Sequence, residues 1–286
     1  MAKAYVLYNP LAGNGTSQQD VKKLETMISD PIEYFDVTRI TNYSAFLNDL
    51  ATEDYLILCG GDGTLNRFIN NTSNINITQE ILYYPMGSGN DFAREVCPDT
   101  NNPVSITKYL KDLPYVEVNG KTYRFLNGIG FGIDGYCCEV GEKLRAESSK
   151  KIDYTGIAIK GLLFHFDSRN AKVTVDGKTY QYKNVWIAPT MNGKYYGGGM
   201  IPTPGQDRIG PEKKLSVLIF HGKFRLPVLC VFPSIFKGKH INHKKKVNLH
   251  TGHKITVEFD RPTPLQIDGE TILGVTSYTA YSSASI

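Results

Sequence analysis

The sequence lacks the patterns that would place this protein in several large functional classes. It has five cysteines, an odd number without a C-x-x-C pair, so neither a disulfide framework nor a cysteine zinc site is indicated. No apolar run approaches the roughly 20 residues of a membrane-spanning helix, and no signal peptide precedes the first strand pattern. The net charge of +4 is too small to favour nucleic acid as a partner. We therefore expect a cytoplasmic protein whose only contact with a membrane is peripheral.

Common nucleotide and zinc signatures are also absent or out of context. The Walker A pattern G-x-x-x-x-G-K-[ST] does not occur. Residues 130–135 match G-x-G-x-x-G, but they follow a hairpin strand and not a βαβ unit, so dinucleotide binding is not indicated. There is no H-E-x-x-H, and we expect four neighbouring histidines to be solvated on a hairpin: His240, His243, His250 and His253.

Strands alternate with helices over the first third of the chain. Short apolar runs at 4–8, 34–40, 55–59 and 81–84 each precede a turn and then a helical pattern. This alternation predicts an α/β domain with a doubly wound, mostly parallel sheet, which resembles the fold of NAD kinases. Sheets of this kind bind ligands at the carboxyl ends of their strands.

The pattern changes near residue 115. Asn119-Gly120 and Asp176-Gly177 each stand between two strand patterns, as in tight hairpins. Further short strands follow, interrupted by helical patterns at 139–148 and 154–166, and their Gly and Pro turns predict a β-sandwich. We expect an α/β domain over residues 1–120 and a β-rich domain over residues 121–276.

The turn Gly60-Gly61-Asp62-Gly63 carries the clearest chemistry. It stands between a buried strand and a helix, where glycines let the backbone N–H groups and the helix N-terminus approach an anion. Asp62 inside such a cradle repels phosphate unless a metal ion or a proton donor lies between them. The turn therefore indicates Mg-nucleotide chemistry, and the alternative is a turn that needs glycine only for its backbone geometry.

Five segments occur in an order that resembles the diacylglycerol kinase catalytic-domain family, in its compact bacterial form, to which sphingosine and ceramide kinases are related. They are Asn9-Pro10 with Gly13 and Gly15, then 60–66, 85–94, 127–134 and 267–270. The resemblance implies a two-domain lipid kinase that binds ATP in the α/β domain and holds its lipid in the β-rich domain. It also implies that a C-terminal strand at about 277–286 returns to the N-terminal domain.

The resemblance also assigns site residues. Glu270 matches the family's general base, and Asp62 matches the carboxylate that organises Mg²⁺ beside the phosphates and could share the proton-accepting task. Asp91 and Asp134 match acidic positions that contact the lipid headgroup. The residues that would line the ATP site are Asn9, Thr38, Gly60, Gly61, Asp62, Gly63, Thr64, Asn66 and Ser88. The residues alone also allow two simpler interpretations. Glu270 would then be a solvated residue after a tight turn, and Asp134 would be a turn residue without a role in binding.

One loop departs from the family pattern. Bacterial members carry an Asp-Gly loop that holds a structural Mg²⁺, but residues 201–215 contain no Asp-Gly pair. Glu212 and Asp207 are the nearest acids, and Lys213 and Lys214 add unfavourable charge for a cation. The sequence therefore leaves the residues of a structural metal site unknown.

The predicted function is ATP- and Mg²⁺-dependent phosphorylation of a lipid hydroxyl, with diacylglycerol as the first substrate. The alternatives are a kinase for another lipid alcohol, such as a sphingoid base or phosphatidylglycerol, an NAD-kinase-like kinase for a soluble substrate, and a non-catalytic lipid- or nucleotide-binding relative. The partner is a lipid at the membrane surface, and a homodimer is left open. The lysine-rich segment 237–254 is either a solvated hairpin or a surface for anionic headgroups.

Overall fold

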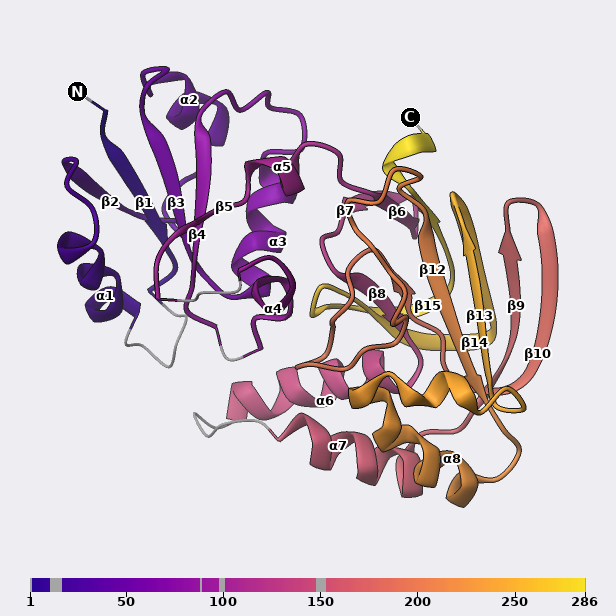
Figure 1. The fold of residues 1–286 in the computed structure, drawn as a ribbon. Helices are drawn as coiled ribbons and strands as arrows, with labels where there is room; N and C mark the ends of the chain where they lie inside the picture. Colours follow the sequence, from indigo (N-terminus) through magenta and orange to yellow (C-terminus); the bar gives the residue numbers. More distant parts are fainter. Residues whose placement is uncertain (1, 11–16, 88, 98–100, 148–152, 286) are drawn as a thin grey trace. The chain divides into compact units, whose positions relative to one another are not determined.

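The computed structural model describes residues 2–10, 17–87, 89–97, 101–147 and 153–285 (Figure 1). The chain divides into two compact units, Met1–Asp112 and Leu113–Ile286. This division lies a few residues before the expected boundary near residue 120, because the hairpin that follows Asp112 belongs to the second sheet.

The first unit is built on a five-stranded sheet with the order β2-β1-β3-β4-β5, in which the first four strands are parallel and β5 is antiparallel. Its strands are β1 (Ala4–Tyr8), β2 (Ile32–Asp36), β3 (Tyr55–Gly60), β4 (Glu80–Pro85) and β5 (Val104–Ser105). The central strands are buried on both faces, as expected when helices cover a parallel sheet.

A helical segment follows each strand of this sheet. These segments are α1 (Ser17–Asp20), η2 (Val21–Thr26), α2 (Tyr43–Asn48), α3 (Asp62–Asn71), α4 (Asp91–Val96) and α5 (Thr107–Leu110). Val21 and Leu24 of η2 pack with the β1 and β3 side chains in one core cluster. The predicted βα repeats of this unit are therefore confirmed.

The second strand is shorter than the sequence pattern suggested. It ends at Asp36, whose side-chain Oδ1 accepts hydrogen bonds from the backbone N–H of Thr38 (2.9 Å) and from its hydroxyl (2.7 Å). This local turn competes with further strand pairing, so the prediction of a strand up to residue 40 was wrong.

The second unit contains a ten-stranded sheet that folds on itself. Its strands are β6 (Tyr115–Val118), β7 (Lys121–Arg124), β8 (Gly128–Phe131), β9 (Arg169–Val175), β10 (Lys178–Ile187), β11 (Thr190–Met191), β12 (Leu215–His221), β13 (Val247–Gly252), β14 (Lys254–Ile267) and β15 (Glu270–Tyr281). The long β14 pairs with β15, β8 and β9, and its inner face packs on the buried residues of the facing strands. The α/β plus β-sandwich fold class is confirmed, although β14, with 14 residues, is longer than the short strands expected in this region.

Three hairpins of this unit turn on Asx-Gly pairs. Both residues have positive φ in Asn119-Gly120 (50° and 74°), Asp176-Gly177 (47° and 84°) and Asp268-Gly269 (47° and 95°). This is the geometry that two-residue hairpins require and that Asn, Asp and Gly tolerate. The two hairpins predicted from sequence are confirmed.

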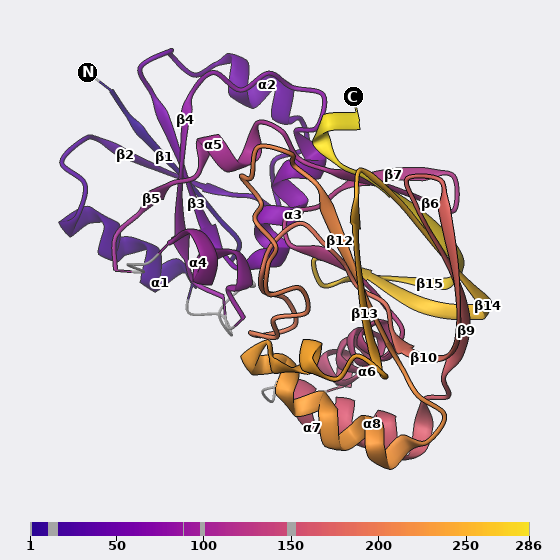
Figure 2. The same cartoon turned by 45° about the vertical axis from the view of Figure 1, so that its right-hand side comes forward.

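Helices gather at one end of the second unit, where α6, α7 and α8 lie together in both views (Figures 1 and 2). The helical segments of the second unit are α6 (Ile133–Glu147), α7 (Tyr154–Lys160), the π-helical turn η3 (Gly161–His165), α8 (Arg225–Val231), η4 (Phe232–Lys237), η5 (Lys239–Asn242) and, after the last strand, η6 (Ser283–Ser285). Side chains of α6, α7, η3, α8 and η4 pack on the sheet through a second core cluster that includes Trp186 and Phe220. None of the helices in the described residues is long and apolar enough to cross a membrane.

The expectation that the four neighbouring histidines are solvated was wrong for His240 and His250, whereas His243 is exposed. His240 is fully buried with its Nε2 2.8 Å from the Pro202 carbonyl oxygen, and burial lowers the pKa of His240. His250 lies on β13, where its ring stacks on Tyr180 and its Nε2 is 2.6 Å from the Tyr182 hydroxyl. These histidines pair with residues far away in sequence, which a local pattern does not show.

The last strand belongs to the second sheet. β15 pairs with β14 and with β6, so the C-terminal strand meets residues 115–118, which the sequence boundary had assigned to the N-terminal domain. In the structure, β6 and β15 are both part of the second unit.

Candidate active site

Most of the residues predicted for the nucleotide site lie at the carboxyl edge of the first sheet. Asn9 follows β1, Thr38 follows β2, and Gly60 ends β3. Because these parallel strands are neighbours in the order β2-β1-β3, the topology brings the three positions to one edge. Ser88, like Gly13 and Gly15 in the turn after Asn9, lies outside the described residues.

The β3–α3 turn needs its glycines for close packing. A Cβ on Gly60 would lie 2.3 Å from the Thr64 Oγ1 atom, and one on Gly87 would lie 2.5 Å from the Gly61 Cα atom. The turn after β3 and the turn after β4 therefore touch through bare backbone. Since Gly61 is the N-cap of α3 and has no side chain, the helix N-terminus is left open toward an anion.

Asp62 has a structural role that sequence reasoning missed. Its Oδ2 accepts the backbone N–H of Asp91 and its Oδ1 that of Phe92, both at 2.9 Å. These are the first residues of α4, so the carboxylate caps a neighbouring helix and complements its dipole. The sequence did not indicate this role, because the N-cap position of α4 is Asn90, a residue type that often caps a helix itself.

Asn90 closes the turn between β4 and α4. It has a left-handed φ of 47°, and its side chain turns back to Gly87, accepting the N–H at 3.0 Å and donating to the carbonyl oxygen at 2.6 Å. Asp91 follows with a buried side chain, its Oδ1 3.9 Å from Arg94 Nε. The predicted contact of Asp91 with a lipid headgroup stays a prediction.

The remaining helical positions of the predicted nucleotide site are Gly63, Thr64 and Asn66, in the first turns of α3. Asn66 is buried, and Asn70 Nδ2 donates to its carbonyl oxygen at 2.9 Å and lies 3.3 Å from its Oδ1. Asn66 therefore supports the helix from within, while Gly63 and Thr64 stand at its N-terminal end.

In the second unit, Asp134 forms a buried acidic site at the start of α6. Its Oδ2 accepts a hydrogen bond from the buried Tyr196 hydroxyl at 3.2 Å, and its Oδ1 has no hydrogen-bond partner among the described residues. Burial raises the pKa of Asp134 to about 6, against the effect of the Tyr196 hydrogen bond. Gly130 makes room for this group, since a Cβ there would lie 1.6 Å from Oδ2 and 2.6 Å from Gln266 Nε2.

In the Asp268-Gly269-Glu270 segment, Asp268 has a structural role and Glu270 lies beyond the turn. The buried Asp268 carboxylate accepts three backbone N–H groups, from Leu126 (2.6 Å), Asn127 (2.8 Å) and Gly128 (3.0 Å). It thereby fixes the loop before β8 to the β14–β15 turn. Glu270 is the half-buried first residue of β15, beyond that turn.

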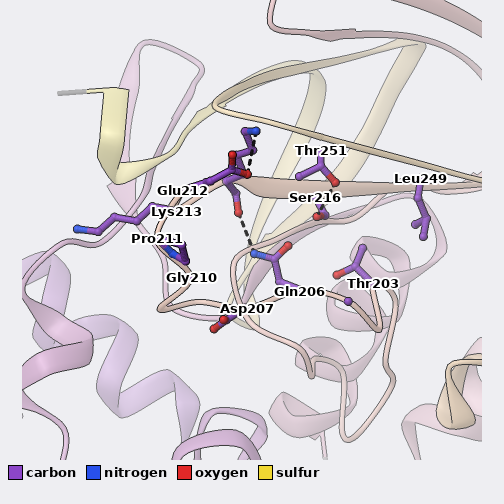
Figure 3. A pocket seen from close by; sticks show the side chains of 12 residues that line it. Thr203, Gln206, Asp207, Gly210, Pro211, Glu212, Lys213, Ser216, Leu249 and Thr251 are labelled. Carbon is purple, nitrogen blue, oxygen red and sulfur yellow. Dashed lines mark hydrogen bonds and ion pairs between the residues drawn. The ribbon is translucent and has the colours of Figure 1, made fainter.

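The loop at 201–215 pairs its acidic residue Glu212 with a lysine. Lys214 Nζ is 3.0 Å from Glu212 Oε2, and Gln206 Nε2 donates to the Lys214 carbonyl oxygen at 2.9 Å. Glu212 and Gln206 are labelled among the side chains of this loop in Figure 3. The loop borders a cavity of about 420 Å³. Within the described ranges, no three His, Cys, Asp or Glu side chains are grouped to hold a metal ion.

Family models match both units. Residues 3–115 match the diacylglycerol kinase catalytic domain, and residues 127–281 match the YegS C-terminal NAD kinase beta sandwich-like domain. The chain belongs to the diacylglycerol kinase catalytic-domain family. It is therefore a kinase, and the resemblance seen in the sequence motifs is confirmed.

Relatives of this diacylglycerol kinase-family protein carry lipid-kinase names. "Putative lipid kinase YtlR" of Bacillus subtilis is 26% identical over 254 residues, which cover 80% of this chain and 78% of the relative. "Putative lipid kinase SaurJH9_0749" of Staphylococcus aureus is 25% identical over 249 residues, 84% of this chain and 76% of the relative. A solved structure titled a putative diacylglycerol kinase from Bacillus anthracis superposes with a TM-score of 0.69 at 21% identity, covering 99% of this chain and 93% of that one, which shows a shared fold.

Proposed function

We propose that this kinase transfers the γ-phosphate of ATP to the hydroxyl of a lipid, with diacylglycerol as the first candidate. The observation that carries the proposal is the match of residues 3–115 to the diacylglycerol kinase catalytic domain, because this range contains every residue predicted for the ATP site. The lipid-kinase names of the relatives support the substrate class, and the choice of diacylglycerol is our proposal.

The ATP phosphates would meet the open N-terminus of α3. Its first-turn N–H groups and the bare backbone of Gly60 and Gly61 suit an anion that must approach closely. Asn9 and Thr38, at the ends of β1 and β2, would extend the same site along the sheet edge. These residues bind and orient the nucleotide, which in phosphoryl transfer is most of what a protein contributes.

Magnesium fits this site as part of the nucleotide complex. Mg²⁺ usually keeps several waters and binds through one or two carboxylates plus substrate phosphates, so one carboxylate at the phosphate site is sufficient. Asp62 would supply it, since it is the first residue of α3 and its carboxylate stands at the turn where the phosphates would bind. When bound, the ion would neutralise the charge that develops on the transferred phosphoryl group.

The acceptor side would use acidic residues of the second unit. Glu270 would accept the proton of the lipid hydroxyl, which requires a carboxylate within hydrogen-bond reach of that oxygen. Asp134 would hold a headgroup hydroxyl, because its unpartnered Oδ1 and its raised pKa let it act as acceptor or donor. The protein would work as a peripheral enzyme, since the substrate resides in a bilayer.

The test is transfer of labelled γ-phosphate from ATP to a panel of lipids in mixed micelles with Mg²⁺, with NAD in a parallel reaction. Labelled phosphatidic acid from diacylglycerol is the expected product. Label in another lipid alcohol would keep the reaction and replace the substrate, whereas label in the NAD reaction alone, or in no product, would refute the proposal.

A further inference from the structure

Three large apolar side chains project from the helical end of the second unit. Phe164 is 72% exposed, Phe224 67% and Leu226 68%, which makes them the most exposed large hydrophobic side chains among the described residues. We call them the apolar tip cluster. Single exposed hydrophobic side chains are normal on a protein surface. Three of them on adjoining segments are typical of an interaction surface.

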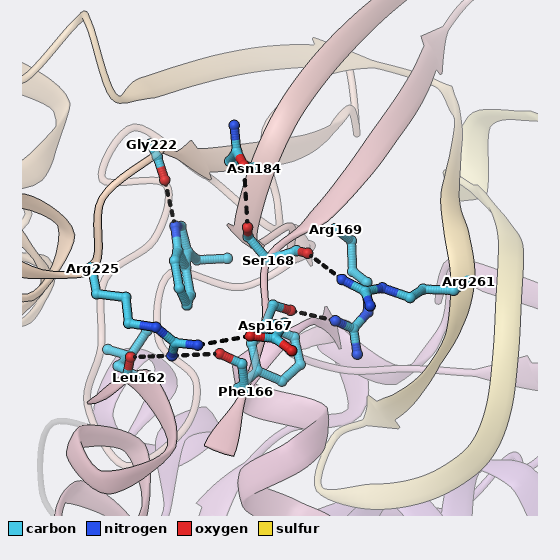
Figure 4. Close-up of polar contacts among 10 residues, drawn as sticks. Leu162, Phe166, Asp167, Ser168, Arg169, Asn184, Gly222, Arg225 and Arg261 are labelled. Atoms are coloured by element: carbon cyan, nitrogen blue, oxygen red, sulfur yellow. Dashed lines mark hydrogen bonds and ion pairs between the residues drawn. The ribbon is translucent and has the colours of Figure 1, made fainter. Parts of the chain in front are cut away.

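Arg225 holds the two segments of the cluster side by side. Its guanidinium donates to the carbonyl oxygens of Leu162 and Phe166, both at 2.8 Å, and pairs with Asp167 Oδ1 at 2.7 Å (Figure 4). Arg225 opens α8 between Phe224 and Leu226, and its carbonyl partners lie on either side of Phe164 in the chain. The two segments are therefore held together by a cation that caps the end of η3.

Positive charge flanks the cluster. Lys160 and Lys223 are exposed, and within the part of the chain that the structure describes neither has an acidic partner. Lys223 Nζ lies 5.5 Å from the centre of the Phe224 ring. Beside them is a polar hollow of about 370 Å³, lined by the cations Lys223, Arg225 and Arg261 and the carboxylates Asp167 and Asp260. The surface thus combines apolar tips with an excess of cations.

We propose that the apolar tip cluster and its flanking lysines dock this protein on an anionic lipid bilayer. Aromatic and leucine side chains enter the boundary between headgroups and acyl chains, while lysines above it attract anionic headgroups. This inference rests on the proposed function, because it supplies the bilayer contact that a lipid kinase needs. A symmetric contact with a second copy is disfavoured, since it would bring the same unpaired lysines of both copies together.

The test is partitioning onto vesicles of phosphatidylcholine mixed with phosphatidylglycerol, measured by sedimentation. The variant Phe164→Ala/Phe224→Ala/Leu226→Ala should partition at least about tenfold more weakly than the unchanged protein. The matched control Ile209→Ala/Leu249→Ala/Leu273→Ala removes three other exposed apolar side chains, which are 57%, 40% and 60% exposed, and should partition as the unchanged protein does. All six positions are exposed, so both variants should stay folded.

A charge-matched pair locates the cationic part of the surface. Lys160→Glu/Lys223→Glu should weaken binding to the mixed vesicles about tenfold or more. Each lysine near an anionic membrane surface strengthens binding about fivefold, and a glutamate in its place is also repelled by the anionic headgroups. Lys244→Glu/Lys245→Glu, in the lysine-rich segment, should change it less. A larger loss in the second pair would place docking on that segment and overturn the proposal.

Other outcomes are equally decisive. Unchanged partitioning of the apolar variant, or an equal loss in its matched control, would overturn docking through this cluster. A dimer that becomes a monomer in the apolar variant would assign the surface to a second copy instead. Vesicle binding is measured without ATP, so a failure of phosphate transfer to every lipid would refute the proposed function and not the docking surface. Conversely, transfer to a water-soluble short-chain diacylglycerol should be retained by the apolar variant.

Discussion

The buried carboxyl of Asp134 should make the stability of this protein depend on pH. Burial raises the pKa of Asp134 from 3.8 to about 6, so the folded protein binds this proton more tightly than the unfolded chain does. The free energy of unfolding should therefore be highest below pH 4 as far as this group is concerned. The free energy of unfolding should fall as the pH rises from the pKa of Asp134 in the unfolded chain to its pKa in the folded protein. Above the folded-state pKa it should stay at the lower level.

The size of the effect follows from the shift. A difference of about two pKa units corresponds to about 3 kcal/mol of unfolding free energy. The substitution Asp134→Asn removes the titration but keeps an oxygen that can accept the Tyr196 hydrogen bond. The stability of the variant relative to the unchanged protein should therefore rise by about 3 kcal/mol between pH 4 and pH 7.

Urea unfolding at several pH values measures this difference. Trp186, the only tryptophan, lies in the same core cluster as Ile133 at the start of α6, so its fluorescence reports on the unit that contains Asp134. A second variant, Tyr196→Phe, removes a hydrogen bond that favours the ionised carboxyl and should extend the pH dependence to higher pH. Equal pH dependence of the Asp134→Asn variant and the unchanged protein would show that this carboxyl is not perturbed as we infer.

Three further predictions concern the packing of the site. Asp62→Ala should lower the hydrogen-exchange protection of the first α4 amides, with a stability cost of about 2 kcal/mol, and normal protection would contradict the capping role. Gly87→Ala should lower the free energy of unfolding by about 1–3 kcal/mol, because the added Cβ would meet neighbouring backbone. The control Gly89→Ala, whose Cβ would lie 3.6 Å from its nearest neighbour, should be nearly neutral. Equal losses of stability in the two variants would refute the close approach of the two turns. Asp268→Ala should lower the free energy of unfolding by about 3 kcal/mol or more, because three buried backbone N–H groups lose their acceptor. The control Asp176→Ala, in an exposed turn of the same geometry, should lower it by less than half as much.

The sequence predicted the parts of the fold that depend on local patterns. Apolar runs of strand length, each followed by a turn and a helical period, predicted the βα repeats of the first unit. Asn-Gly and Asp-Gly pairs predicted two hairpins, because few residues tolerate the positive φ that such turns need. The carboxyl edge of the first sheet followed from the same reasoning, since parallel neighbours end at the same side.

Pairings between distant residues could not be predicted in this way. Asp268 binds backbone groups about 140 positions earlier in the chain, and His240 reaches the carbonyl of Pro202. Nothing in the local sequence of either residue specifies its partner. The role of Asp134 illustrates the same limit, because its burial depends on Tyr196 and on the absence of a side chain at Gly130.

Asp62 shows how a residue proposed to bind Mg²⁺ can also have a structural role. Its carboxylate binds the first N–H groups of α4 while its own residue opens α3, so it connects the N-termini of the two helices. A substitution there should alter both the turn that would receive the phosphates and the segment that contains Asp91. Loss of turnover in Asp62→Ala would therefore not by itself show a chemical role. The informative comparison is with Asp62→Asn, which keeps one acceptor oxygen for the helix but loses the negative charge that a Mg²⁺ ion would bind. If Asp62→Asn restores amide protection in α4 without restoring turnover, the charge itself is required for the reaction; if it restores both, the residue acts by capping alone.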